Sequence, residues 1–242
     1  IVLRTTNGSI TLNDGTSGSG IAVSANGSGN VLLNAGGTGS ITSNADVVGG
    51  SGHITLTAAD AIIQNADITT GVSGTVSMTA TSGNITMSSG TVTTTSGGAI
   101  AYRASAGVAL SRIVSGSGAV TVTAGYNTSS GAITDNLASE NANIVTAGQV
   151  TLTAATGIGT SGTGDIDTNI DLLTATNNVS GGIYIDDAGS LTVNGSGVRT
   201  LGGNGDISIV AAGNLTIGAG SSPAIGPVTA DGTGSITLTA GS

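Results

Sequence analysis

A five-residue pattern recurs along the whole chain: glycine, a small or polar residue, an aliphatic residue, usually threonine or serine, and a second aliphatic residue. The alternation of aliphatic and hydroxyl side chains is typical of a short β-strand with one buried and one solvent-facing side. A glycine before each strand permits the backbone angles of a sharp turn. The pattern occurs at residues 8–12, 29–33, 52–56, 74–78, 83–87, 118–122, 148–152, 189–193, 205–209, 213–217 and 234–238.

The spacing of the pattern predicts a solenoid. Nearly even steps separate Gly8, Gly29, Gly52, Gly74, Gly98 and Gly118. Weaker strands follow Gly20, Gly39 and Gly83, and a period of about 20 residues with two or three short strands is typical of one stacked coil. We expect an all-β, parallel β-solenoid of roughly ten to twelve coils of about 20–24 residues. After Gly118 the steps lengthen, first to Gly148 and then to Gly182, which predicts loops in the middle of the chain.

An antiparallel sandwich or barrel is the alternative fold. Asn-Gly pairs at Asn7, Asn26, Asn194 and Asn204 suit two-residue hairpin turns. Against this alternative, the strand patterns repeat in one direction and one phase, as parallel stacking requires. The chain also has three tyrosines and no phenylalanine or tryptophan, so its interior must be built from small aliphatic side chains. A thin interior of that kind suits an elongated body, and we expect one domain over residues 1–242.

Charge and composition exclude several functions. The net charge is −9, with four arginines and no lysine, which argues against nucleic-acid binding because phosphate affinity comes mostly from basic side chains. No apolar run approaches the roughly 18–20 residues that span a bilayer. The absence of cysteine excludes disulfide frameworks and cysteine-based zinc sites.

Two segments carry a family resemblance: GDISIVAAGNLTI at residues 205–217 and GQVTLTAATGIG at residues 148–159. They resemble repeats of filamentous haemagglutinin-like exoproteins and related large bacterial β-strand-repeat adhesins. The resemblance implies a right-handed parallel β-helix on a cell surface or in an extracellular fibre. Since residues 1–3 and 236–240 read as ordinary strand, we expect a segment of a longer solenoid or of a head-to-tail filament. The expected function is a non-catalytic structural or adhesive fibre segment. Its expected partners are copies of itself, adjoining solenoid segments and surface glycans.

An acidic cluster supports a second hypothesis, a polysaccharide-active β-helix enzyme. Asp165 and Asp167 alternate with Ile166, so on a strand they would share the solvent side about 7 Å apart. Asp186 and Asp187 lie one coil later, as does Asp171. Paired carboxylates of this kind suit acid–base cleavage of sugars. The surrounding sequence lacks basic partners and has one nearby aromatic residue, Tyr184, so we interpret the cluster as solvated acidic positions.

The remaining polar motifs predict little chemistry. A calcium-repeat-like stretch covers residues 202–206, but its aspartate, Asp206, comes one residue early. We expect no cofactor, and a structural calcium ion at this stretch or at the acidic cluster is the alternative. The single histidine, His53, occupies a polar slot of a strand and is expected on the surface.

Thr-x-Thr pairs give a third hypothesis, an ice-binding face. These pairs would project from the outside of the solenoid, although they skip coils. They are Thr55/Thr57, Thr93/Thr95, Thr121/Thr123, Thr151/Thr153 and Thr237/Thr239.

Overall fold

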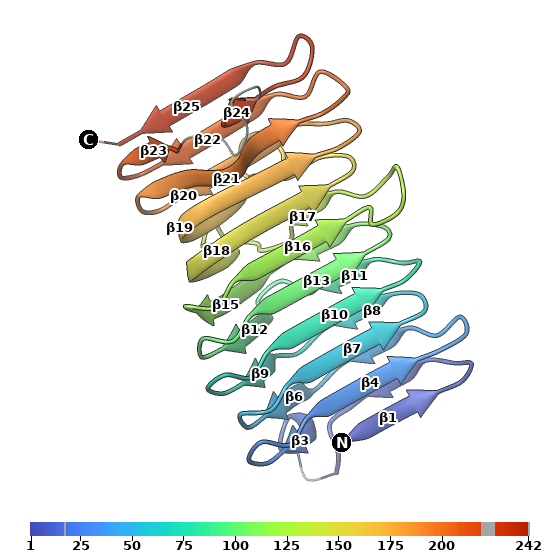
Figure 1. Cartoon of the computed structure of the whole chain (residues 1–242). Helices are drawn as coiled ribbons and strands as arrows, with labels where there is room; N and C mark the ends of the chain where they lie inside the picture. The colour runs from blue at the N-terminus through green and yellow to red at the C-terminus, as the bar shows by residue number, and fades with distance from the viewer. Residues whose placement is uncertain (17, 219–225, 242) are drawn as a thin grey trace.

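The computed structural model describes residues 1–16, 18–218 and 226–241, and the secondary structure of these residues consists of strands joined by turns. The strands pair in parallel and stack as a β-solenoid (Figure 1), which confirms the predicted fold class. Along one face of the solenoid ten strands follow one another in register, so the number of coils lies at the lower end of the expected ten to twelve. Some turns are longer than the others, such as the one that separates Val120 from its register partner Val150.

Each turn carries strands on three faces, which we number in the order in which the chain meets them. One 19-stranded sheet contains the strands of the first and third faces and the last three strands of the second face, and the first six strands of the second face form another sheet. The first face contains β1 (Val2–Thr5), β4 (Val31–Ala35), β7 (Ile54–Ala58), β10 (Val76–Ala80), β13 (Ile100–Ala104), β16 (Val120–Ala124), the C-terminal parts of β18 (Ile144–Ala154), β19 (Ile166–Asn177) and β21 (Leu191–Thr200), and β24 (Val228–Thr229).

The second and third faces complete each turn. The second face contains β2 (Ile10–Leu12), β5 (Ile41–Ser43), β8 (Ile62–Gln64), β11 (Ile85–Met87), β14 (Val108–Leu110), β17 (Ile133–Asp135), the bridge residue Ile158, β20 (Ile183–Asp187), β22 (Ile207–Ala211) and β25 (Ile236–Ala240). The third face contains β3 (Ile21–Ala25), β6 (Asp46–Gly49), β9 (Ile68–Thr70), β12 (Val92–Thr95), β15 (Arg112–Gly116), the N-terminal parts of β18, β19 and β21, and β23 (Leu215–Ile217).

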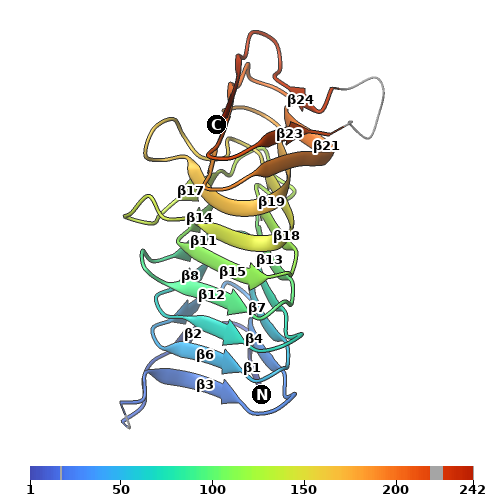
Figure 2. The same ribbon diagram turned by 90° about the vertical axis from the view of Figure 1, so that its left-hand side faces the viewer.

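The winding is right-handed, as the resemblance implied. In Figure 1 the near strands run from left to right while the chain rises from its N-terminus at the bottom. Figure 2 shows the left-hand side, where β3, β6, β12 and β15 run toward the near face of Figure 1. A chain that crosses the near face to the right, returns behind and rises is a right-handed coil.

The predicted alternation decides which side chains enter the core. In β7, Ile54 and Leu56 are fully buried while Thr55 and Thr57 point outward. Each inward aliphatic residue stacks on its register partner in the next coil, and the buried residues form one continuous cluster along the axis. Because each coil supplies few large side chains, the core gains its apolar burial by repetition along the axis.

A stack of glycines lies at the corner before the first face: Gly29, Gly52, Gly74, Gly98, Gly118 and Gly148. A Cβ added to any of the last five would meet the carbonyl oxygen of the glycine one coil earlier, at 2.5 Å in the case of Gly74. None of the six has a positive φ, so the backbone angles of a sharp turn, the expected reason for these glycines, do not require glycine here. The close approach of successive coils requires them. The pattern that begins at Gly8 belongs to the second face, where Gly39 stacks on it.

The interior also contains a buried polar network. The Tyr102 hydroxyl donates to Thr93 Oγ1 at 2.5 Å, and that hydroxyl donates to Gln64 Oε1 at 3.0 Å. Gln64 Nε2 in turn donates to the Val92 carbonyl at 3.2 Å. Burial raises the pKa of Tyr102 above its ordinary range. The network satisfies three polar side chains that would otherwise be costly inside a thin apolar core.

Candidate functional site

An acidic surface cluster forms where β19 and β20 stack. Asp167 of β19 is the register partner of Asp186 in β20, and both point outward because the alternating Ile166 and Ile185 are buried. Asp165, two residues before Asp167, is half-buried beside them. The structure thus brings together three of the four aspartates that the sequence suggested for a catalytic role.

The fourth aspartate, Asp187, lies inside the solenoid and does not join the cluster. It is fully buried, and its carboxylate accepts hydrogen bonds from Thr168 Oγ1 at 2.8 Å and from the backbone nitrogens of Ile170 and Gly189 at 3.0 Å. These bonds hold the corner that joins two coils. Asp187 is therefore a structural residue. Asp171 is exposed in β19, away from the carboxylates that converge around Asp167.

Glu140 completes the cluster, although its position in the sequence did not predict this. It lies in the loop between β17 and β18, and one carboxylate oxygen each from Glu140, Asp165 and Asp167 lie within 4.8 Å of one another. The buried Asn143 fixes this loop, since its Nδ2 donates to Asp135 at 2.6 Å and its Oδ1 accepts from the Asp167 backbone nitrogen at 3.0 Å. The longer step between Gly118 and Gly148 predicted a loop, but not where it folds.

Like charges and partial burial change the acidity of the cluster. Burial, with the neighbouring charges of Asp165 and Glu140, raises the pKa of Asp167 to about 7. Burial and the charge of Asp186 raise the pKa of Asp165, and burial with the charge of Asp187 raises the pKa of Asp186. A carboxyl group of this kind can hold a proton near neutral pH and release it to a bound molecule.

The shape of this surface limits its chemistry. Glu140, Asp167, Thr168 and Asp186 border a pocket of about 210 Å³. No aromatic or arginine side chain of the described residues lines it, so it offers neither a stacking surface for a sugar ring nor a cation. The three close carboxylates of Glu140, Asp165 and Asp167 are the oxygen ligands that a hard divalent cation prefers.

The calcium-like stretch at residues 202–206 is placed elsewhere. The Asp206 carboxylate accepts a hydrogen bond from the Ser235 backbone nitrogen at 2.7 Å, and the Asn204 side chain accepts one from the Thr233 nitrogen at 3.1 Å. Both side chains therefore connect one coil to the next.

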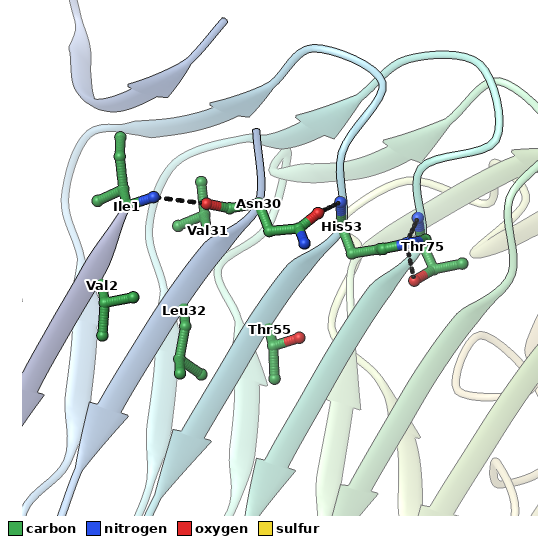
Figure 3. Close-up of a pocket in the computed structure, with 8 residues that line it drawn as sticks. All are labelled: Ile1, Val2, Asn30, Val31, Leu32, His53, Thr55 and Thr75. Atoms are coloured by element: carbon green, nitrogen blue, oxygen red, sulfur yellow. Dashed lines mark hydrogen bonds between the residues drawn. The ribbon is translucent and has the colours of Figure 1, made fainter. Parts of the chain in front are cut away.

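His53 lies on the outside, in a polar file that crosses successive coils (Figure 3). Its backbone nitrogen donates to Asn30 Oδ1 at 2.8 Å, and its Nδ1 accepts from the Thr75 nitrogen at 3.2 Å. The histidine thus bridges its two neighbouring coils. No carboxylate lines the shallow surface that Figure 3 shows around it.

The Thr-x-Thr pairs divide between faces. Three of the five expected pairs lie outward on the first face, in register with Ser77/Thr79 and Thr174/Thr176, and Ala101 and Arg103 interrupt this array. Thr93 and Thr95 lie on the third face and are buried, so the expectation that they project outward was wrong. Thr93 is the register partner of Ile68 and Ile113, and because both isoleucines point into the core, Thr93 does as well. The pair Thr237/Thr239 lies on the second face, in β25.

Comparisons with known protein families, with curated proteins and with solved structures found no match to this chain. A search of the described residues for a helix long and apolar enough to cross a membrane also found none.

Proposed function

We propose that this chain is a non-catalytic segment of an extracellular structural or adhesive fibre. The core consists of files, which are rows of apolar side chains stacked from one coil to the next. The observation that carries the proposal is that no further coil covers these files at either terminal coil. In the second-face file, Ile207 and Ile209 are buried, whereas their partners one coil later, Ile236 and Leu238, are 46% and 42% exposed. At the other end Leu3 of β1, the register partner of the buried Leu33, is 39% exposed.

Exposed strand edges with apolar rows beside them recruit further strands. A coil of the same kind, from an adjoining solenoid segment or from another copy of the chain, would cover these files and continue the backbone ladders. Such a head-to-tail contact does not close on itself and produces a filament. The resemblance to filamentous haemagglutinin-like exoproteins supports an extracellular location. The scarcity of basic residues also supports it, because trypsin-like proteases would find few sites to cut.

Sedimentation velocity of the purified chain tests the proposal. We expect the wild type to form end-to-end oligomers that grow with concentration, and Leu238→Lys to reduce them by placing a charge at the open end. Ile63→Lys is the matched control, because Ile63 is 36% exposed on the side of the solenoid, in β8. Single rods at every concentration for all three proteins would reject the proposal.

One observation favours the second candidate function, a polysaccharide-active enzyme: Asp167, with a pKa of about 7, borders a pocket beside Asp186 and Glu140. Incubation with acidic and neutral polysaccharides tests it. Cleavage by the wild type that is lost in Asp167→Asn would support the enzyme. No cleavage of either kind of polysaccharide would leave the fibre proposal in place. The third candidate, ice binding, is tested by thermal hysteresis. The interruption of the threonine array at Arg103 predicts none.

A further inference from the structure

The basic residues of this acidic protein are concentrated on one face. Three of its four arginines, Arg4, Arg103 and Arg199, point outward from the first face and fall in one register file. The strands of that face contain no aspartate or glutamate: residues 2–5, 31–35, 54–58, 76–80, 100–104, 120–124, 150–154, 173–177, 198–200 and 228–229. The thirteen acidic residues lie elsewhere, so the first face is positive although the net charge of the chain is −9.

The arginines are evenly spaced along the axis. The register file, read from one coil to the next, is Arg4, Asn34, Thr57, Thr79, Arg103, Thr123, Thr153, Thr176 and Arg199. Four coils therefore separate each arginine from the next. At about 4.8 Å per coil, guanidinium groups recur at roughly 19 Å along the face. Hydroxyl and amide side chains occupy the positions between them.

A groove surrounds the middle arginine. It has a volume of about 630 Å³, and its lining includes Thr79, Arg103, Thr121, Thr123 and Tyr126. The guanidinium carbon of Arg103 lies 4.4 Å from the centre of the Tyr126 ring, which is 40% exposed. Within the described part of the chain, Arg103 makes no ion pair, so its N–H groups remain free to bind an anion.

The loop after β16 holds Tyr126 in place. The Tyr126 backbone nitrogen donates to the Ala104 carbonyl at 2.9 Å, and Ser105 Oγ donates to the Tyr126 carbonyl at 3.2 Å. Thr128 Oγ1 donates to the Ser105 carbonyl at 2.7 Å. The loop is thereby bonded to the preceding coil, and the ring forms a fixed wall of the groove. The ligand does not have to order this wall when it binds.

We infer that the first face binds an acidic polysaccharide along the solenoid axis, with the groove at Arg103 and Tyr126 as its central subsite. The guanidinium fork matches the geometry of a carboxylate or sulfate group. The tyrosine ring offers an apolar surface to the face of a sugar, and the threonine hydroxyls of the file can donate to and accept from sugar hydroxyls.

Charge density separates this ligand from nucleic acid. Double-stranded DNA carries one negative charge per roughly 1.7 Å of its axis, and binding proteins neutralise many phosphates with closely spaced basic side chains. One arginine per roughly 19 Å does not meet that need. A polymer with many hydroxyl groups and sparser acidic groups matches the file of threonines between arginines. The inference names a partner for the proposed adhesive segment and depends on that function only for its biological meaning.

Isothermal titration with oligogalacturonate tests the inference, and its fully methyl-esterified form is the uncharged control ligand. The protein used is the Leu238→Lys variant, so that self-association does not enter the measurement. We expect oligogalacturonate to bind and the ester to bind at least tenfold more weakly. Arg103→Gln should weaken binding about tenfold, which corresponds to about 1.4 kcal/mol, and Tyr126→Ala should weaken it similarly.

Arg112→Gln is the matched control variant, because Arg112 is exposed on the third face, in β15. It should bind as the wild type does. Equal binding by Arg103→Gln, equal binding of the methyl ester, or binding of a DNA oligonucleotide in place of the uronate would overturn the inference. None of these results bears on sedimentation, so the fibre proposal stands or falls separately.

Discussion

Replacement of a single stacked glycine by alanine should destabilise the solenoid because the added Cβ would collide with the backbone of the preceding coil. In Gly98→Ala, the new Cβ would overlap the carbonyl oxygen of Gly74 and lie 2.6 Å from its carbonyl carbon. Carbon atoms in ordinary contact are about 3.5–4.0 Å apart, so the two coils must separate by roughly 1 Å. The hydrogen bond from the Val76 nitrogen to the Ala99 carbonyl, now 3.1 Å long, joins the coils at this corner and would break.

The expected cost is the sum of these two effects. Overpacking of a close contact costs about 1–3 kcal/mol, and the loss of one backbone hydrogen bond about 1 kcal/mol. We therefore expect Gly98→Ala to lower the free energy of unfolding by about 2–4 kcal/mol. The matched control is Gly29→Ala, which begins the same five-residue pattern. A Cβ there has Asn26 O at 3.2 Å as its nearest neighbour, so the change should stay within about 0.5 kcal/mol.

Urea denaturation followed by circular dichroism measures both variants against the wild type. The shift of the transition midpoint, multiplied by a common m-value, gives each change in stability. Equal shifts for Gly98→Ala and Gly29→Ala would refute the reasoning, since both glycines precede a strand and differ only in the carbonyl beneath them.

Three further predictions concern single side chains. Asp187→Ala should lower the free energy of unfolding by about 3 kcal/mol because it leaves three hydrogen-bond donors without an acceptor. Asp186→Ala on the surface should change the urea midpoint little, and similar midpoints for the two variants would contradict this prediction. Asp167 holds its proton to about pH 7 in the folded chain but, with an ordinary value of 3.8, loses it earlier when unfolded. The free energy of unfolding should therefore fall as pH rises between these values. Asp167→Asn should reduce the dependence of the thermal unfolding midpoint on pH between pH 4 and pH 8. An unchanged dependence would exclude a contribution of Asp167 to it. Tyr102→Phe removes the donor to the buried network around Gln64 and should lower the free energy of unfolding by about 1–2 kcal/mol; an unchanged urea midpoint would contradict the role of the network.

The strands and their inward sides were predictable because a period of two links sequence directly to burial. Ile54 and Leu56 were assigned inward and Thr55 outward by alternation alone, and the structure agrees. β12 reads Val-Thr-Thr-Thr, so no aliphatic alternation sets its direction. The neighbouring coils decide it, and local pattern could not show that Thr93 points inward.

The functional surfaces depend on registers that local sequence does not contain. Glu140 lies beside Asp165 and Asp167 of the following coil only because of the way the inserted loop between β17 and β18 folds. The file of Arg4, Arg103 and Arg199 appears only when the length of every intervening coil is known. Coil length is not constant, since the coil from Val120 to its partner Val150 is half as long again as the coil from Ile100 to its partner Val120.

Electron cryo-microscopy of the native protein tests most directly whether coils continue to stack beyond the two open ends. The account predicts filaments in which the strand spacing of about 4.8 Å continues across every junction between segments, with Ile236 and Leu238 covered by the next coil. Discrete rods that meet side by side, or that stay separate with Ile236 and Leu238 exposed to solvent, would contradict it.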